Sequence, residues 1–268
     1  MLAERERERE RETVEIDSCL TFKERYLHWW DYASTIPELM HGLNDLVVAG
    51  KVLYLGISDT PAWVVSKANQ YARDHGLRQF VVYQGMWNAA MRDFERDIIP
   101  MCRDEGMALL PYGTLGQGRF QTEAGFKERE ENNPGRQGKK VSAVERAVSK
   151  VMEGLAAEKK TAITSIAMAY VMPKAPYVFP LVGGRKVEHI KGNIAALEVD
   201  LTEEDVARID EAYRFDPGFP HTFLSGTLFG AEDDAQEQVT GPESVWLTNI
   251  MGTFDWVLGS KPIKAFKK

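Results

Sequence analysis

Short apolar segments alternate with polar turns and amphipathic segments along most of this chain. The apolar segments cover residues 26–30, 52–57, 80–83, 107–110 and 177–182. Polar or glycine-containing turns follow them, and most lead into a segment with helical periodicity. Strands that alternate with helices in this way predict a parallel sheet with helical crossovers. The pattern is compatible with a (β/α)₈ barrel and equally with an open, doubly wound sheet.

The expected helices have recognisable ends. They cover residues 36–49, 61–75, 91–105, 142–159, 161–172, 187–197 and 202–213. Gly50, Gly76 and Gly106 close three of them, as glycine commonly does at the end of a helix. Thr202 is the expected N-cap of the last helix, with Asp205 at the capping-box position. Residues 113–140 are expected to form a long polar loop, and residues 216–268 to form loops and a short helix.

Charge and composition argue against several classes of function. The net charge of −7 over 268 residues disfavours nucleic acid or an anionic membrane surface as a partner. Cys19 and Cys102 lack the spacing of a metal site or a disulfide framework, so we expect no metal and a reducing, cytoplasmic location. No apolar run is long enough to cross a membrane. Residues 1–25 alternate Glu and Arg over 4–12 and are expected to form a disordered or frayed arm before a single domain at 26–268.

Polar residues gather where the expected strands end. They are His28, Ser58, Gln84, Tyr112 and Arg185. The carboxyl ends of parallel strands meet at one edge of the sheet, which is where ligands bind in both candidate folds. The last of these strands is apolar without alternation, so both of its faces are expected to be covered by other elements. It leads into Gly183 and Gly184, expected to turn sharply, and then into Arg185 and Lys186 at a helix start. This corner would suit a phosphate, although an ordinary turn with solvated cations has the same residue types.

Several longer motifs occur in an order typical of one family. They are YLHWWDY at 26–32, GKVLYLGISDTPAWVVS at 50–66, YQGMWN at 83–88, RDFERDIIPM at 92–101, GQGRF at 116–120, the stretch 183–193, and FDPGFP at 215–220. With these motifs the chain resembles the aldo-keto reductases, and within them the fungal aryl-alcohol dehydrogenase and norsolorinic acid reductase group. The resemblance implies a TIM-type (β/α)₈ barrel that binds NADP(H) and a small carbonyl substrate. Only strand–helix units four to eight are recognisable, so the barrel is expected to be incomplete.

The resemblance also implies roles for individual residues. His28 would be the catalytic histidine that orients the substrate carbonyl, and Trp29 would border the substrate. The cofactor-binding residues would be Ser58, Asp59 and Gln84 at the nicotinamide carboxamide, Tyr112 stacked on its ring, Gly113, Thr114, Leu115, Gly116, Gln117, Gly118 and Arg119 around the pyrophosphate, Arg185 and Lys186 at the 2′-phosphate, and His189 and Asn193 at the adenine. Asp59 stands where asparagine is commoner, and a carboxylate accepts hydrogen bonds without donating them.

The family's catalytic tetrad is Asp, Tyr, Lys and His, and its first three members belong to earlier strand–helix units. The 25 residues before Tyr26 are too few to supply three units of about 30 residues each. Tyr32 is a better-placed substitute proton donor than Tyr26. The expected function is NADPH-dependent reduction of an aryl aldehyde, a ketone, or a fungal polyketide or meroterpenoid intermediate. The alternatives are a catalytically impaired remnant or pseudo-enzyme, and an interaction subunit whose open sheet edges would allow oligomerisation.

Overall fold

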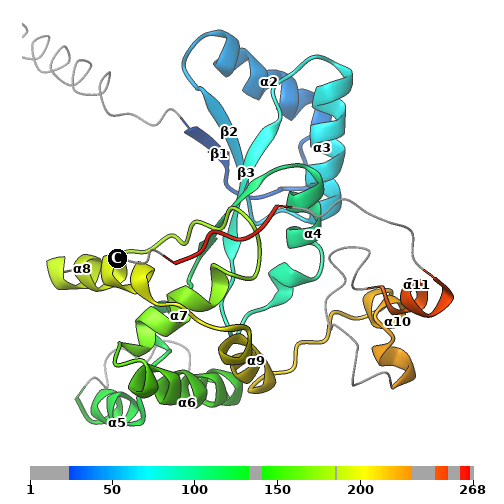
Figure 1. Ribbon diagram of the computed structural model, residues 1–268. Coiled ribbons are helices and arrows are strands. Elements are labelled where there is room, and N and C mark those ends of the chain that lie inside the picture. Colours follow the sequence, from blue (N-terminus) through cyan, green and yellow to red (C-terminus); the bar gives the residue numbers. More distant parts are fainter. Residues whose placement is uncertain (1–23, 133–140, 185, 231–244, 253–259, 266–268) are drawn as a thin grey trace, which may run out of the picture.

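The computed structural model describes residues 24–132, 141–184, 186–230, 245–252 and 260–265. At its centre is a parallel sheet with the spatial order β1 (Glu24–Leu27), β2 (Tyr54–Ser58), β3 (Phe80–Met86) and β4 (Ala108–Tyr112) (Figure 1). In its register, Leu27 pairs with Ile57 and Ser58 pairs with Gln84. The carboxyl ends of neighbouring strands therefore lie at one edge, as the sequence predicts.

The first strand differs from its expected position. It begins at Glu24 and ends at Leu27, whereas residues 26–30 were expected to form it. His28 and Trp29 consequently lie in the connection that follows the strand. Asp31 closes this connection by accepting hydrogen bonds from the backbone N–H groups of Ala33 and Ser34, both at 2.9 Å. The rest of the predicted charged arm, residues 1–23, lies outside the described residues.

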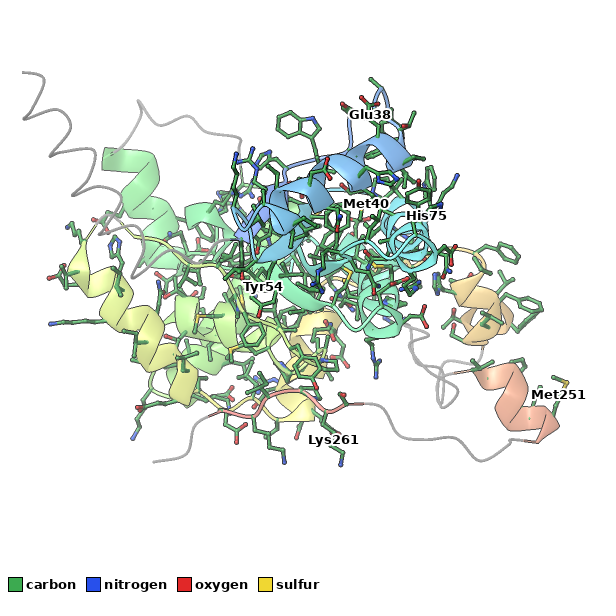
Figure 2. The ribbon with its side chains drawn as sticks, turned by 90° about the horizontal axis from the view of Figure 1, so that it is seen from above. Glu38, Met40, Tyr54, His75, Met251 and Lys261 are labelled. Carbon is green, nitrogen blue, oxygen red and sulfur yellow. The ribbon has the colours of Figure 1, made fainter. Side chains whose placement is uncertain are left out.

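Helices α2 (Ile36–Val48) and α3 (Ala62–Asp74) confirm the expected crossovers after β1 and β2. Each buries one apolar stripe in the core that it shares with the sheet: Met40, Val64 and Val65 are fully buried, as is Ile57 on β2. Figure 2 shows Glu38 pointing outward from α2. Thr35 caps this helix by accepting a hydrogen bond from the Glu38 N–H at 3.3 Å.

The helix expected over residues 91–105 is interrupted. The structure has a 3₁₀ turn, η1 (Asp93–Glu95), and then the helix α4 (Ile98–Asp104). Its amphipathic pattern is misleading because Arg92 and Glu95 are buried at 4% and 1% exposure. Pro100 lacks the N–H that a continuous helix over 91–105 would need at that position, and in the structure it lies in the first turn of α4, where a proline is tolerated.

The second half of the described chain is mainly helical. Its elements are η2 (Gly116–Gly118), α5 (Glu123–Asn132), α6 (Ala143–Glu158), α7 (Ile163–Val171), α8 (Val187–Ala195), η3 (Ala196–Glu198), α9 (Glu203–Glu211), α10 (His221–Leu224), η4 (Thr227–Phe229) and α11 (Trp246–Met251). The capping box of Thr202 and Asp205 at α9 is confirmed. The expectation of a structureless loop over 113–140 is wrong, because η2 and α5 lie within it; residues 133–140 are outside the described part.

The fifth expected strand, residues 177–182, forms an extended segment without regular strand structure. The Leu109 N–H donates to the Tyr177 carbonyl at 3.0 Å, and the Phe179 N–H donates back to the Leu109 carbonyl at 2.8 Å. The segment thus continues the sheet beside β4. Phe179, Leu181 and Val182 are 48%, 39% and 42% exposed, so the expectation that both faces are buried is wrong.

These elements form part of a (β/α)₈ barrel, with β1 at one edge and the segment 177–182 at the other. Figure 1 shows α2 and α3 beside one part of the sheet and α5, α6 and α9 grouped at the opposite end of the molecule. Among the described residues, no helix is both long and apolar enough to span a bilayer.

Candidate functional site

A polar cluster lies where β2 and β4 end, at the carboxyl edge of the sheet. The Tyr112 hydroxyl donates a hydrogen bond to the Asp59 carboxylate, 3.2 Å from each oxygen. The Ser58 hydroxyl donates to Asp59 Oδ2 at 3.3 Å. Burial, and then the negative charge and hydrogen bond of Asp59, raise the pKa of Tyr112. The structure therefore brings together three of the residues, Ser58, Asp59 and Tyr112, that the family resemblance assigns to the nicotinamide.

The turn that holds Asp59 is braced from the neighbouring strand by Tyr83. The Thr60 N–H donates to the Tyr83 hydroxyl at 3.0 Å, and that hydroxyl donates to the Thr60 carbonyl at 2.7 Å. Asp59 has a φ of 43°, in the left-handed region that Asp tolerates better than most residues. Tyr83 is the first residue of the YQGMWN motif at 83–88, yet nothing in the local sequence indicates its bracing role.

The other residues predicted at this edge, Gln84, His28 and Trp29, make fewer contacts with the cluster of Ser58, Asp59 and Tyr112. Gln84 lies within β3, because the strand runs to Met86 instead of ending at Tyr83; its carbonyl accepts the Asp59 N–H at 3.1 Å. His28 and Trp29 are exposed, with ring centroids 4.8 Å apart. In the described part of the chain, no hydrogen bond or ion pair connects His28 to Asp59 or Tyr112.

The predicted pyrophosphate loop follows β4 directly. Gly113, Gly116, Gln117 and Gly118 all have positive φ, between 51° and 81°, so the chain coils tightly here. A side chain at position 116 would approach the Phe120 ring to 2.7 Å, which explains the glycine. Asn88 anchors the loop by donating to the Gly113 carbonyl at 3.1 Å, a role that the sequence analysis missed.

Arg119, at the end of this loop, is held by an acidic partner. Its Nε lies 2.9 Å from Glu145 Oε1 and 3.1 Å from the Gly116 carbonyl. The Glu145 carboxylate also completes the capping box of α6 with Ser142. The guanidinium therefore ties the loop to the start of α6 and has only its remaining N–H groups to offer a phosphate.

The predicted adenine end is formed by α8. Lys186 is the exposed N-cap residue of this helix, and Arg185 lies outside the described residues. Gly183 and Gly184 do not adopt the positive φ that a sharp glycine turn would use. Instead, a Cβ at Gly184 would lie 2.5 Å from the Cβ of His189, so glycine allows this histidine to pack closely.

Two buried atoms among the predicted cofactor-binding residues have no hydrogen-bond partner within the described part of the chain. They are Thr114 Oγ1 in the pyrophosphate loop and Asn193 Nδ2 on α8. Buried polar atoms are nearly always satisfied, so an orphaned one indicates a missing ligand or water. One orphaned atom lies at the predicted pyrophosphate site and the other at the predicted adenine site, which fits a dinucleotide ligand.

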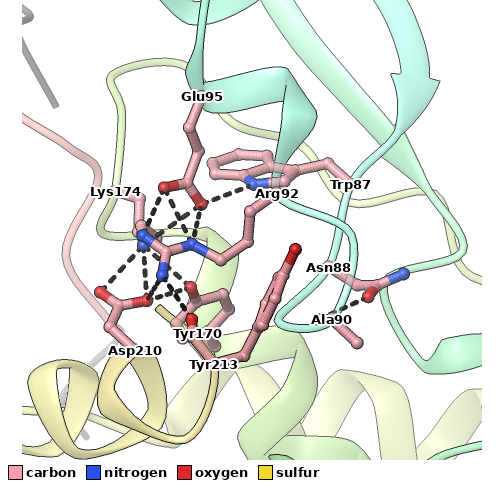
Figure 3. Close-up of polar contacts among 9 residues, drawn as sticks. All are labelled: Trp87, Asn88, Ala90, Arg92, Glu95, Tyr170, Lys174, Asp210 and Tyr213. Carbon is pink, nitrogen blue, oxygen red and sulfur yellow. Dashed lines mark hydrogen bonds and ion pairs between the residues drawn. The ribbon is translucent and has the colours of Figure 1, made fainter. Parts of the chain in front are cut away.

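A second polar cluster is deeply buried between η1, α7 and α9 (Figure 3). The Glu95 carboxylate contacts Arg92 at 2.8 Å and Lys174 at 3.2 Å. Asp210 contacts the same two cations, at 3.1 and 2.9 Å. Tyr170 donates a hydrogen bond to Asp210. Two cations thus balance two anions, and the cluster holds η1 against both helices.

This cluster contains Asp, Tyr and Lys, the residue types of the first three members of the family's tetrad, but in an environment unsuited to proton transfer. Tyr170 is fully buried. Burial and the charge of Glu95 raise its pKa well above the usual value, despite the opposing effect of Arg92. A catalytic tyrosine needs a lowered pKa and access to substrate. We therefore interpret the cluster as structural.

Comparisons with known proteins show which family and which fold this chain is similar to. The sequence matches the family model described as aldo/keto reductase family over residues 21–214. Norsolorinic acid reductase B of Dothistroma septosporum is 69% identical over 242 residues, covering 89% of this chain and 60% of that protein. The NADP(+) aryl-alcohol dehydrogenase of Phanerodontia chrysosporium is 50% identical over 216 residues, covering 78% of this chain and 55% of that protein.

A crystal structure of a thermostable aldo-keto reductase in complex with the inhibitor epalrestat has a TM-score of 0.56 and 21% sequence identity, covering 71% of this chain and 59% of that one. At this identity the likeness concerns the fold alone. The chain spans about 60% of the length of the first curated relative that it matches.

Proposed function

Because the chain belongs to the aldo/keto reductase family, we propose that it is part of an NADPH-dependent reductase of aldehydes or ketones. Its relatives named norsolorinic acid reductase and aryl-alcohol dehydrogenase favour an aryl carbonyl or a fungal polyketide or meroterpenoid intermediate as substrate. The observation that carries the proposal is the cluster of Ser58, Asp59 and Tyr112 at the carboxyl edge of the sheet.

The residues present fit a dinucleotide. The cofactor, when bound, supplies the hydride that reduces the carbonyl carbon. Tyr112, held by Asp59, would offer a ring face for stacking. Thr114 Oγ1 and Asn193 Nδ2 would gain the hydrogen-bond partners that they lack. Lys186, together with Arg185, would pair with a 2′-phosphate, which favours NADPH over NADH.

Reduction also needs a proton donor at the carbonyl oxygen, and no described residue fills this role well. His28, exposed beyond β1, would orient the carbonyl. The Tyr26 hydroxyl donates to Glu24, and burial followed by that negative charge raises its pKa to about 12, making it a weaker acid. Tyr32 is 70% exposed in the same connection and is the remaining candidate. Loss of general acid catalysis costs roughly 10²–10⁴ in rate, so we expect this chain alone to be inactive or very slow.

A second candidate role is that of an interaction subunit. Phe179, Leu181 and Val182 expose apolar surface at the open edge of the sheet beside β4. Open edges pair readily with other strands. A catalytically impaired remnant or pseudo-enzyme could also act as an interaction subunit of this kind.

Cofactor binding and turnover separate these proposals. Titration of the chain with NADPH and NADH should show tighter binding of NADPH, and Arg185→Ala should remove most of the difference; Lys150→Ala on α6 is the control. Equal dissociation constants for both cofactors in the unaltered chain would rule out the 2′-phosphate assignment.

Single-turnover NADPH oxidation should be slow in this chain and fast in a chain extended by three preceding strand–helix units. Comparable rates in both chains would refute the need for those units and implicate Tyr32, testable as Tyr32→Phe.

A further inference from the structure

A cavity of about 370 Å³ lies outside the candidate cofactor site, between the β1–α2 connection and α3. Three aromatic side chains, Trp30, Trp63 and Tyr71, contribute to its walls. Its volume lies within the range of small-molecule sites in proteins. Trp63, Lys67 and Tyr71 are spaced four residues apart on α3 and therefore share one face of that helix.

The aromatic wall is braced from behind. Tyr71 stacks on His75 with ring centroids 3.9 Å apart, and its hydroxyl lies 3.2 Å from Nε2 of His41 on α2. Trp63, in contrast, lines the cavity but is 62% exposed. A tryptophan with so much apolar surface in water, on the same helix face as the fixed ring of Tyr71, offers a surface for a flat apolar group.

The charge of the residues that line the cavity also favours one kind of ligand. Lys67 is the one charged residue that lines it, and among the described residues it forms no ion pair. At the cavity, the Ser34 hydroxyl donates to Asp31 at 2.9 Å. Thr35 Oγ1 accepts from the Glu38 N–H and keeps its own O–H as a donor, which also suits an anion. A ligand's polar group would therefore meet a cation, which selects an anion.

We propose that this cavity is a binding site for planar aromatic carboxylates, with the ring against Trp63 and Tyr71 and the carboxylate paired with Lys67. The site is separate from the Asp59–Tyr112 cluster and does not depend on the proposed reduction.

Calorimetric titration with 2-naphthoate and its neutral isostere 2-naphthamide tests this site. The unaltered chain should bind the anion about threefold to tenfold more tightly than the amide. Lys67→Gln should abolish that preference, whereas Lys150→Gln, an exposed lysine on α6, should preserve it. Trp63→Ala should weaken both ligands by about fivefold, and Trp63→Phe should restore most of the binding.

Asp59→Asn should bind 2-naphthoate as the unaltered chain does, which separates this site from the candidate cofactor edge. The proposal is wrong if 2-naphthoate does not bind at millimolar concentration, if both ligands bind the unaltered chain equally, or if neither Trp63→Ala nor Lys67→Gln changes the affinity.

Discussion

Asp59 carries out two tasks at the residue scale. Its backbone turns the chain at the end of β2 with φ 43°, and its carboxylate fixes the hydroxyls of Tyr112 and Ser58. The family resemblance implies that asparagine is the commoner residue at this position. Its side chain would tolerate the same backbone conformation but would present an NH₂ donor group and a carbonyl acceptor. The carboxylate can only accept, so in this chain it orients both hydroxyls towards itself.

Asp59→Asn should therefore lower the pKa of Tyr112. The Asp59 charge disfavours the phenolate, so removing the charge makes the phenol easier to ionise, while burial still holds its pKa above the usual value of about 10. Because the pKa of the folded state is raised, this pair stabilises the fold below pH 10 and loses that effect as the pH rises further.

Ultraviolet absorbance of tyrosinate, titrated in each protein and in its Tyr112→Phe counterpart, isolates the Tyr112 transition. An unchanged Tyr112 pKa in Asp59→Asn would show that the carboxylate does not control this hydroxyl.

Some parts of this site were predictable from sequence and others were not. Ser58 and Asp59 follow an apolar strand, so their position at the sheet edge follows from the pattern. The Tyr83 and Asn88 side chains donate hydrogen bonds to the backbone carbonyls of Thr60 and Gly113, respectively. These partners are distant in sequence, so the contacts depend on the conformations of the loops that carry them. The resemblance drew attention to their motif but not to their roles.

At the scale of elements, the buried cluster of Arg92, Glu95, Lys174 and Asp210 includes η1, which stands with α4 where one regular helix was predicted. The sequence pattern over 91–105 is amphipathic, so it predicts a surface helix. Charged residues in such a pattern are normally solvated. Nothing local indicates that Lys174, just after α7, and Asp210 on α9 will contact Arg92 and Glu95. Helix capping is local, which explains why the start of α9 at Thr202 was predictable.

Glu95→Gln should destabilise the fold by about 3–5 kcal/mol, because it leaves Arg92 and Lys174 buried with one anion between them. Urea denaturation followed by far-ultraviolet circular dichroism measures the free energy of unfolding. Glu158→Gln, which breaks the exposed pair with Arg208, is the matched control and should change stability far less. Equal losses in the two variants would contradict a buried, mutually dependent cluster.

At the scale of the whole molecule, the alternation of strands and helices predicted the parallel order, and the resemblance predicted a partial barrel. Burial of the last strand was mispredicted for a physical reason. An apolar run indicates that both faces are covered in the complete fold, but the described chain has no strand beyond the segment 177–182. The apolar sequence of the segment 177–182 thus matches the burial that the segment would have in a complete barrel.

The exposed edge leads to a prediction about association. Phe179 and Leu181 lie two residues apart on one face of an extended segment and expose 48% and 39% of their surface. We expect this chain to self-associate at micromolar concentration, measured by size-exclusion chromatography with light scattering. Phe179→Glu with Leu181→Glu should shift the population towards monomer, because charges on an edge oppose strand pairing.

Val48→Glu, at the exposed end of α2, is the control for removing apolar surface elsewhere and should leave association unchanged. A chain extended by the three preceding strand–helix units should be less associated than this one, because the added strands would pair with both edges within one molecule. A monomeric unaltered chain would show that the edge is not a pairing surface. An extended chain that associates as strongly would show that its added units do not close the barrel.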